Sequence, residues 1–161
     1  MTPERARLES RAMEDLKQLF SDLIRFETEL WNAIDARLRA EHDLPLHKFE
    51  PMQIIASRPN CRVYDIAGAL SLTTGGVSKL IDAIEASGYC KRRPNPDDRR
   101  SSIIELTPSG RKALARATKT FERELELRLR SSVPVRTLAQ FSSSMRALRA
   151  ASGIVDQSAA A

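Results

Sequence analysis

The stretch RRPNPDDRRSSIIELTPSG, residues 92–110, gathers charged side chains around two prolines before it turns into a short apolar segment. Guanidinium groups bind phosphate oxygens, and an arginine at a hairpin tip can enter the minor groove of DNA. The residues of this stretch that we consider for DNA contact are Arg92, Arg93, Asp98, Arg99 and Arg100. Solvated surface charge is the alternative for Arg92, Arg93 and Arg99.

A second candidate site precedes this stretch. Between residues 65 and 84, apolar residues are spaced as a helix-turn-helix requires. In this interpretation Ala67 lets two helices cross closely, Leu72 plugs the corner after the turn, and Val77 seats the second helix. A plain pair of core helices is the alternative, and Ser71 occupies the turn position where glycine is usual.

The second of these helices has an exposed N-terminal side made of short and polar residues. Thr73 is a suitable N-cap. Two glycines in a helix cost roughly 1 kcal/mol each relative to alanine, and close approach of the backbone to a phosphate is a reason to tolerate them. We favour Thr74 and Lys79 for base or phosphate contact. The predicted recognition-helix residues are Thr73, Thr74, Gly75, Gly76, Ser78 and Lys79.

The elements that must position these residues are mostly helices. The pattern predicts a first helix to about residue 40, a second over 43–59 that starts late or bends at Pro51, and two more within 61–89. Strands near 89–93 and 101–106 form the hairpin. A helix restarts at Thr107 and Pro108, breaks at 131–134, and is followed by a last helix. The predicted fold class is mainly α with a two- or three-stranded β wing.

The first helix has an apolar arc of roughly 160°, which is wider than one core-facing stripe requires. We therefore expect it to pack against its own domain on one side and a second chain on the other. Glu27 lies inside this arc. We expect it to form a salt bridge with a basic residue of the last two helices, while a buried acid near an effector or a pH-sensitive dimer pair is the alternative.

Composition excludes several classes of function. The 161 residues contain no stretch long enough to span a membrane, and the charged N-terminus lacks a signal sequence, so a cytoplasmic location is expected. Cys61 and Cys90 are too few for a disulfide framework, and we expect no redox role. His42 and His47 do not complete a metal site. No nucleophile–base pair or phosphate-binding loop is present, so we expect no enzyme, no cofactor and no metal.

Charge is unevenly distributed along the chain. Residues 1–60 carry 9 Lys and Arg against 11 Asp and Glu, whereas residues 107–150 carry 10 against 3. A basic chain with an acidic first third indicates an anionic partner that meets one side of the molecule.

Residues 46–114 resemble the MarR family of bacterial transcription regulators. The resemblance rests on the helix-turn-helix, the wing RRPNPDDRR, and the D-x-R and L-T pattern of Asp98, Arg100, Leu106 and Thr107. It implies a winged helix-turn-helix in a homodimer that places recognition helices in major grooves of a pseudo-palindromic double-stranded DNA operator. The wings would enter minor grooves, with the carboxylate of Asp98 fixing the guanidinium of Arg100. Repression is favoured by this resemblance alone.

The same resemblance organises the chain. Residues 1–42 would form an N-terminal dimerisation helix, 43–106 the DNA-binding lobe and 107–152 the C-terminal dimerisation helices. The Ser/Ala-rich composition of 153–161 independently predicts a disordered tail. A small aromatic or lipophilic effector would bind near Trp31, Phe49 and Met52, although such residues are more often core. The alternative function is an architectural DNA binder or protein-interaction module without a ligand response.

Overall fold

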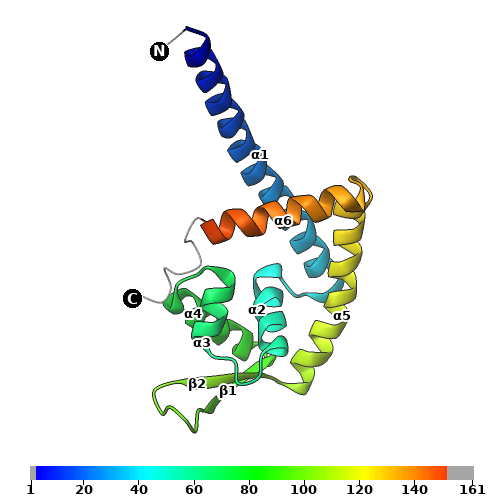
Figure 1. The fold of residues 1–161 in the computed structure, drawn as a ribbon. Helices are drawn as coiled ribbons and strands as arrows, with labels where there is room; N and C mark the ends of the chain where they lie inside the picture. The colour runs from blue at the N-terminus through cyan, green and yellow to red at the C-terminus, as the bar shows by residue number, and fades with distance from the viewer. Residues whose placement is uncertain (1–2, 152–161) are drawn as a thin grey trace.

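The computed structural model describes residues 3–151, so the predicted tail at 153–161 lies outside the described residues. The chain begins with α1 (Pro3–His42), followed by α2 (Leu46–Ser57), α3 (Val63–Leu70) and α4 (Thr74–Ala86). Strands β1 (Cys90–Pro94) and β2 (Ser102–Leu106) form an antiparallel hairpin. The chain then continues through α5 (Pro108–Leu125), η1 (Glu126–Arg130) and α6 (Val135–Ala151). Figure 1 shows the hairpin and the N-terminal end of α1 at opposite ends of the molecule.

The predicted fold class is confirmed: helices dominate, and the sheet has two strands. The break at 131–134 is also confirmed, although α5 first continues into one π-helical segment, η1. None of the described helices is both long and apolar enough to cross a membrane.

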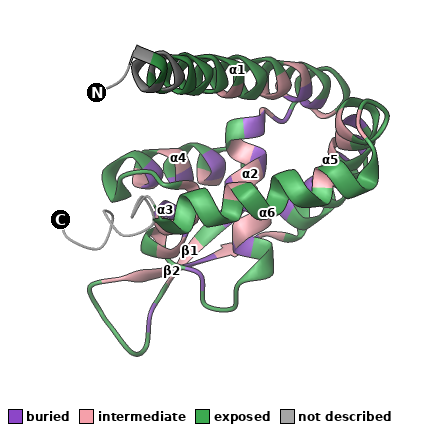
Figure 2. Cartoon of the chain, turned by 45° about the horizontal axis from the view of Figure 1, so that its top comes forward, coloured by how far each residue is buried: buried purple, intermediate pink, exposed green. Residues whose placement is uncertain are grey.

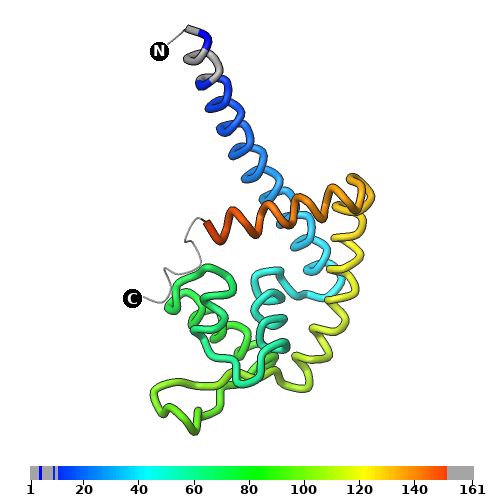
Figure 3. Tube along the Cα trace, in the orientation of Figure 1, coloured from blue at the N-terminus to red at the C-terminus, as the bar shows by residue number. Residues whose placement is uncertain are grey.

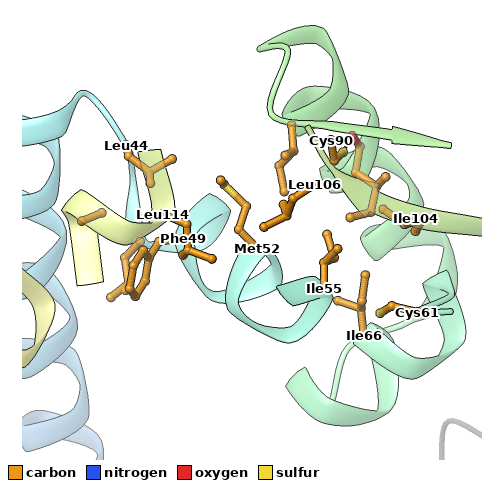
Figure 4. Packing of buried hydrophobic residues seen from close by; sticks show 14 of the residues in the cluster. Leu44, Phe49, Met52, Ile55, Cys61, Ile66, Cys90, Ile104, Leu106 and Leu114 are labelled. Carbon is orange, nitrogen blue, oxygen red and sulfur yellow. Dashed lines mark hydrogen bonds between the residues drawn. The ribbon is translucent and has the colours of Figure 1, made fainter. Parts of the chain in front are cut away.

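The hydrophobic core is centred on α2. Phe49, Met52 and Ile55 are buried on this helix, and α2 packs against α1, α3, α4, α5 and β2. Figure 4 shows these side chains between those of neighbouring elements. The ring of Phe49 lies 4.9 Å, centroid to centroid, from that of Phe121 on α5. Because α2 packs against α3, α4 and β2 of the lobe as well as α1 and α5, this core fixes their relative positions.

The sequence left open whether the helix predicted over 43–59 starts late or bends at Pro51. In the structure α2 begins at Leu46 and runs through Pro51 to Ser57. Its N-terminus has no side-chain cap of its own; the carboxylate of Asp35 on α1 instead accepts a hydrogen bond from the Leu46 N–H at 2.7 Å. Burial raises the pKa of Asp35, but hydrogen bonds from Arg39 and Leu46 outweigh it and hold that pKa below its ordinary value. A charge-assisted cap from α1 therefore fixes where α2 starts.

The turn between α3 and α4 explains the missing glycine. Ser71 adopts a left-handed conformation, with φ 55° and ψ 40°, and ends α3. The Leu72 N–H donates to the Ala67 carbonyl at 3.0 Å, which closes the turn. This geometry leaves the Leu72 side chain 45% exposed, so the prediction that Leu72 plugs the corner is wrong. Ala67 and Val77 are fully buried, as predicted.

Thr107 joins the hairpin to α5. Its hydroxyl donates to the Gly88 carbonyl at 2.7 Å and accepts from the Gly110 N–H at 3.0 Å, so it caps α5 while holding the turn before β1. A Cβ at Gly110 would lie 1.9 Å from the Tyr89 carbonyl oxygen, and only glycine fits there. The sequence TPSG therefore sets the close approach of α5 to the start of the hairpin.

Two carboxylates join α1 to α5. Glu124 is 2% exposed and accepts from Nε of Arg37 at 3.2 Å and from Nε of Arg128 at 3.1 Å. Such a buried acid is stable only because it is paired with cations. The salt bridge that we predicted for Glu27 is wrong in this chain: Glu27 is exposed and accepts a hydrogen bond from Thr28 at 3.3 Å.

Glu41 makes the second contact between these helices. It accepts from Nη2 of Arg123 and from the Thr120 hydroxyl, each at 2.7 Å. The hydrogen bonds from Arg123 and Thr120 outweigh partial burial and lower the pKa of Glu41 to about 2. Since this pKa is lower in the folded than in the unfolded state, ionised Glu41 stabilises the fold.

We expect the contribution of Glu41 to be complete above about pH 4.5 and to be lost as the pH falls from there towards about 2. Denaturant unfolding at stepped pH measures this dependence. The Glu41→Gln variant should be less stable at neutral pH and lose less stability over that acidic range. Glu126→Gln, which removes an ion pair exposed to solvent at both ends, is the control. Equal acid sensitivity in the wild type and Glu41→Gln would contradict the prediction.

Candidate nucleic-acid interface

The N-terminus of α4 is exposed and preorganised. Thr73 has an extended backbone, and its hydroxyl accepts from the Gly76 N–H at 3.2 Å, which confirms the predicted N-cap. Thr74, Gly75 and Lys79 are exposed, whereas Ser78 is half-buried. The free N–H groups and positive dipole end of α4 therefore face outwards, as a helix that binds an anion must present them.

The two glycines of α4 have different surroundings. A Cβ at Gly75 would meet nothing within 4 Å, whereas one at Gly76 would lie 3.2 Å from the Thr73 hydroxyl. Neither glycine has a positive φ. Packing within the chain therefore gives no reason for glycine at position 75, and the bare backbone there is open to an outside partner.

The tip of the wing is a compact turn. Asn95 is 7% exposed; its amide donates to the Ser101 hydroxyl at 2.9 Å and its carbonyl accepts from the Asp97 N–H at 3.1 Å. Asp98 accepts from the backbone N–H of Arg100 at 3.0 Å. The predicted bond from Asp98 to the Arg100 guanidinium is therefore absent from this structure, because the carboxylate shapes the turn instead.

The four arginines among the wing candidates separate into two groups. Arg99 and Arg100 are exposed at the tip, and their side chains form no salt bridge within residues 3–151. Arg92 and Arg93 are half-buried and lie in ion pairs within the wing and its surroundings. Arg99 and Arg100 thus have guanidinium groups free for a phosphate or a groove, whereas Arg92 and Arg93 already have carboxylate partners.

Arg92 connects β1 to α4. Its guanidinium donates to Asp82 at 2.7 Å and to Glu85 at 2.5 Å. Partial burial lowers the pKa of Arg92, but the hydrogen bonds to the two carboxylates more than offset this and raise it. Neither of these acids, nor Asn95, was singled out from the sequence. The spacing of Glu85 and Arg92 across a predicted helix–hairpin junction is the signal that could have identified the ion pair.

The other predicted side chains lie in the core. Phe49 and Met52 are fully buried, and Trp31 is half-buried against the core, so the three do not line an open pocket. Cys61 and Cys90 are buried, and burial raises the pKa of each thiol to about 11, which disfavours the reactive thiolate. His42 hydrogen-bonds Thr120 at 2.8 Å.

The chain matches the model of the MarR family over residues 44–102. The match begins two residues before α2 and ends at the first residue of β2. The resemblance that the sequence showed is thus confirmed for the helix-turn-helix and wing. The HTH-type transcriptional regulator YfiV of Bacillus subtilis strain 168 is 27% identical over 70 residues. The chain spans less than half of that relative, 44% of its length.

Solved structures match over most of the chain. The transcriptional repressor CouR bound to a 23-mer DNA duplex is 29% identical, with a TM-score of 0.72 over 86% of this chain and 96% of its own. CouR from Rhodococcus jostii RHA1 bound to p-coumaroyl-CoA is 17% identical, with a TM-score of 0.70 over 84% of this chain and 90% of its own. The 29%-identical structure that matches over most of the chain is thus that of a transcriptional repressor.

We expect Gly75→Ala to raise the free energy of unfolding by about 0.5–1 kcal/mol, because alanine loses less backbone entropy in an open helical position. Gly76→Ala is the matched control and should gain less, since its Cβ crowds the Thr73 cap. Urea denaturation of both variants measures the difference. A loss of stability in Gly75→Ala would show that the chain itself needs glycine there.

Proposed function

We propose that this chain, whose residues 44–102 form a MarR-family winged helix-turn-helix, is a homodimeric DNA-binding transcription regulator that acts in the cytoplasm as a repressor. Its operator is a pseudo-palindromic DNA duplex. The observation that carries the proposal is the pairing, in one rigid lobe, of an exposed capped helix N-terminus with two free arginines at the tip of the wing. In this arrangement α4 enters a major groove and Arg99 and Arg100 reach the adjoining minor groove.

The proposed partner chain is a second copy. The outer part of α1 exposes several large apolar side chains, and α6 has no buried residue. Figure 2 shows the exposed turns of α1, and Figure 3 follows the same helix beyond the rest of the chain. Contiguous apolar surface of this kind marks an interface. Among the α1 residues whose exposure the structure describes, the exposed large apolar ones are Met13, Leu16, Leu19, Phe20, Ile24 and Phe26.

The domain limits follow from this dimer. Residues 1–42 and 107–152 supply the dimerisation helices, and residues 43–106 supply the DNA-binding lobe. Two lobes related by a two-fold axis would place their α4 helices about one DNA turn apart. A pseudo-palindromic operator mirrors that symmetry.

We further propose that a small aromatic or lipophilic effector weakens operator binding by changing the separation of the two lobes. The complex of the CouR regulator with p-coumaroyl-CoA supports a ligand of this class. Phe49 and Met52 are fully enclosed, so of the three predicted contacts only Trp31 has a surface that such a ligand could reach without opening the core.

Fluorescence anisotropy tests the proposal. The purified protein is titrated against the DNA upstream of its own gene and against a scrambled duplex, at several salt concentrations. A steep salt dependence with a clear preference for the native fragment supports a specific regulator, and effectors are then screened on the same assay. Equal binding to both duplexes indicates an architectural role instead. Absence of binding at low salt would refute the proposed function.

We expect Arg100→Ala to weaken operator binding about 10-fold and to reduce discrimination at the flanking A·T positions, because the arginine no longer enters the narrow minor groove. Anisotropy with operators altered only at those positions measures both effects. Arg116→Ala removes an exposed charge on α5, far along the chain from the wing, and serves as the control. Unchanged affinity in Arg100→Ala would show that the wing does not contact DNA as proposed.

A further inference from the structure

An acidic pair lies on α4, the helix that we place in the major groove. Asp82 and Glu85 both hydrogen-bond the guanidinium of Arg92 on β1, at 2.7 and 2.5 Å. Glu85 also accepts from the backbone N–H of Arg92 at 2.9 Å, and the guanidinium reaches the Ser78 carbonyl at 3.4 Å. Arg92 thus makes four hydrogen bonds to α4, and we call this set of contacts the α4 brace.

Strand geometry explains why Arg92 faces α4. Side chains alternate along a strand, so Arg92 lies on the same face of β1 as Cys90. Cys90 is 2% exposed, and its thiol lies 3.8 Å from the Ile81 carbonyl of α4. The next side chain on that face, Arg92, therefore continues along α4 towards the wing tip and meets the two acids.

The opposite face of β1 carries a second brace. Arg93 pairs with Glu105 on β2 at 2.5 Å, and its guanidinium donates to Asn60 in the loop after α2 at 2.9 Å. Two successive arginines of β1 therefore fix the wing on opposite faces. Arg92 joins it to α4, and Arg93 joins it to β2 and to the loop between α2 and α3. The α4 brace is the one that joins the two elements proposed to read DNA.

We infer that Glu85, assisted by Asp82, is a positioning residue for DNA binding: through Arg92 it fixes the wing tip relative to α4. The inference rests on the proposed DNA-binding function. It also assigns Arg92 to this brace rather than to a phosphate. The side chain of Arg92 is 26% exposed and that of Glu85 is 37% exposed, so the pair is partly shielded from solvent.

The inference predicts that neutralising Glu85 lowers the affinity for DNA, whereas electrostatic repulsion alone predicts that it raises this affinity. An acid close to a DNA phosphate repels it, so its neutralisation ordinarily strengthens binding. If Glu85 holds the wing, Glu85→Gln instead weakens binding, because Arg99 and Arg100 lose their fixed distance from α4. Ionic contacts with DNA are not removed by this change, so the slope of log affinity against log salt concentration stays constant.

The experiment compares two variants with the same change of charge. Glu85→Gln removes the charge and one acceptor oxygen of Glu85 from the contacts with Arg92, whereas Asp97→Asn neutralises an acid of the wing tip whose side chain takes no part in them. Anisotropy at several salt concentrations should show about 5- to 20-fold weaker operator binding for Glu85→Gln at an unchanged salt slope. Asp97→Asn should bind as tightly as the wild type or more tightly.

Two further measurements separate positioning from contact and from misfolding. Arg92→Gln should weaken operator binding as Glu85→Gln does and leave the salt slope unchanged, whereas loss of a phosphate contact by Arg92 would reduce that slope. Amide hydrogen exchange without DNA should be faster in residues 90–106 of Glu85→Gln and unchanged in α2. Faster exchange throughout the lobe would show general destabilisation and overturn the inference.

The outcomes distinguish this inference from the proposed function. If the wild type binds its operator and Glu85→Gln binds equally or more tightly, the inference alone is overturned. A reduced salt slope in Glu85→Gln or Arg92→Gln would also overturn it, because Arg92 would then be a phosphate contact. If the wild type binds no DNA at low salt, the proposed function fails, and the inference fails with it.

Discussion

The burial of α2 is the constraint on which the rest of the lobe depends. Its apolar side chains contact the sheet, both helices of the helix-turn-helix, and the two helices that leave the lobe. Because packing in such a core is close to that of a crystal, these elements cannot shift independently. The exposed end of α4 and the wing are therefore presented as parts of one body, and polar contacts adjust them only locally.

Those local contacts divide the charged residues by role. Acids of α1 and α5 take their arginine partners across the helix junction, and acids of α4 and β2 take Arg92 and Arg93. The arginines that remain without a carboxylate among the described wing residues are Arg99 and Arg100, at the tip. The net charge of the chain says little about this division; what matters is which cations already have partners within the fold.

Most of the architecture could be predicted from the sequence, because helix periodicity, proline positions and the hairpin are local signals. Thr73 was identified as a cap since its residue type and place before a helix suffice. The errors concern tertiary geometry. Leu72 was assigned to the core by its apolar character alone, but the left-handed Ser71 turns it outwards. The cap that Asp35 gives to α2 and the bond between Asp82 and Arg92 join residues whose contact depends on packing angles that no local pattern encodes, whereas the spacing of Glu85 and Arg92 was a signal that we did not use.

The exposed apolar surface of α1 has a consequence for the cell as well as for the molecule. In the proposed dimer a second copy covers the exposed apolar face of α1, and association and completion of the fold are then linked. In the proposed dimer, the amount of DNA-binding species at low abundance then rises with the square of the number of chains. A modest change in synthesis or degradation would produce a larger change in operator occupancy, which gives the promoter a threshold without any ligand.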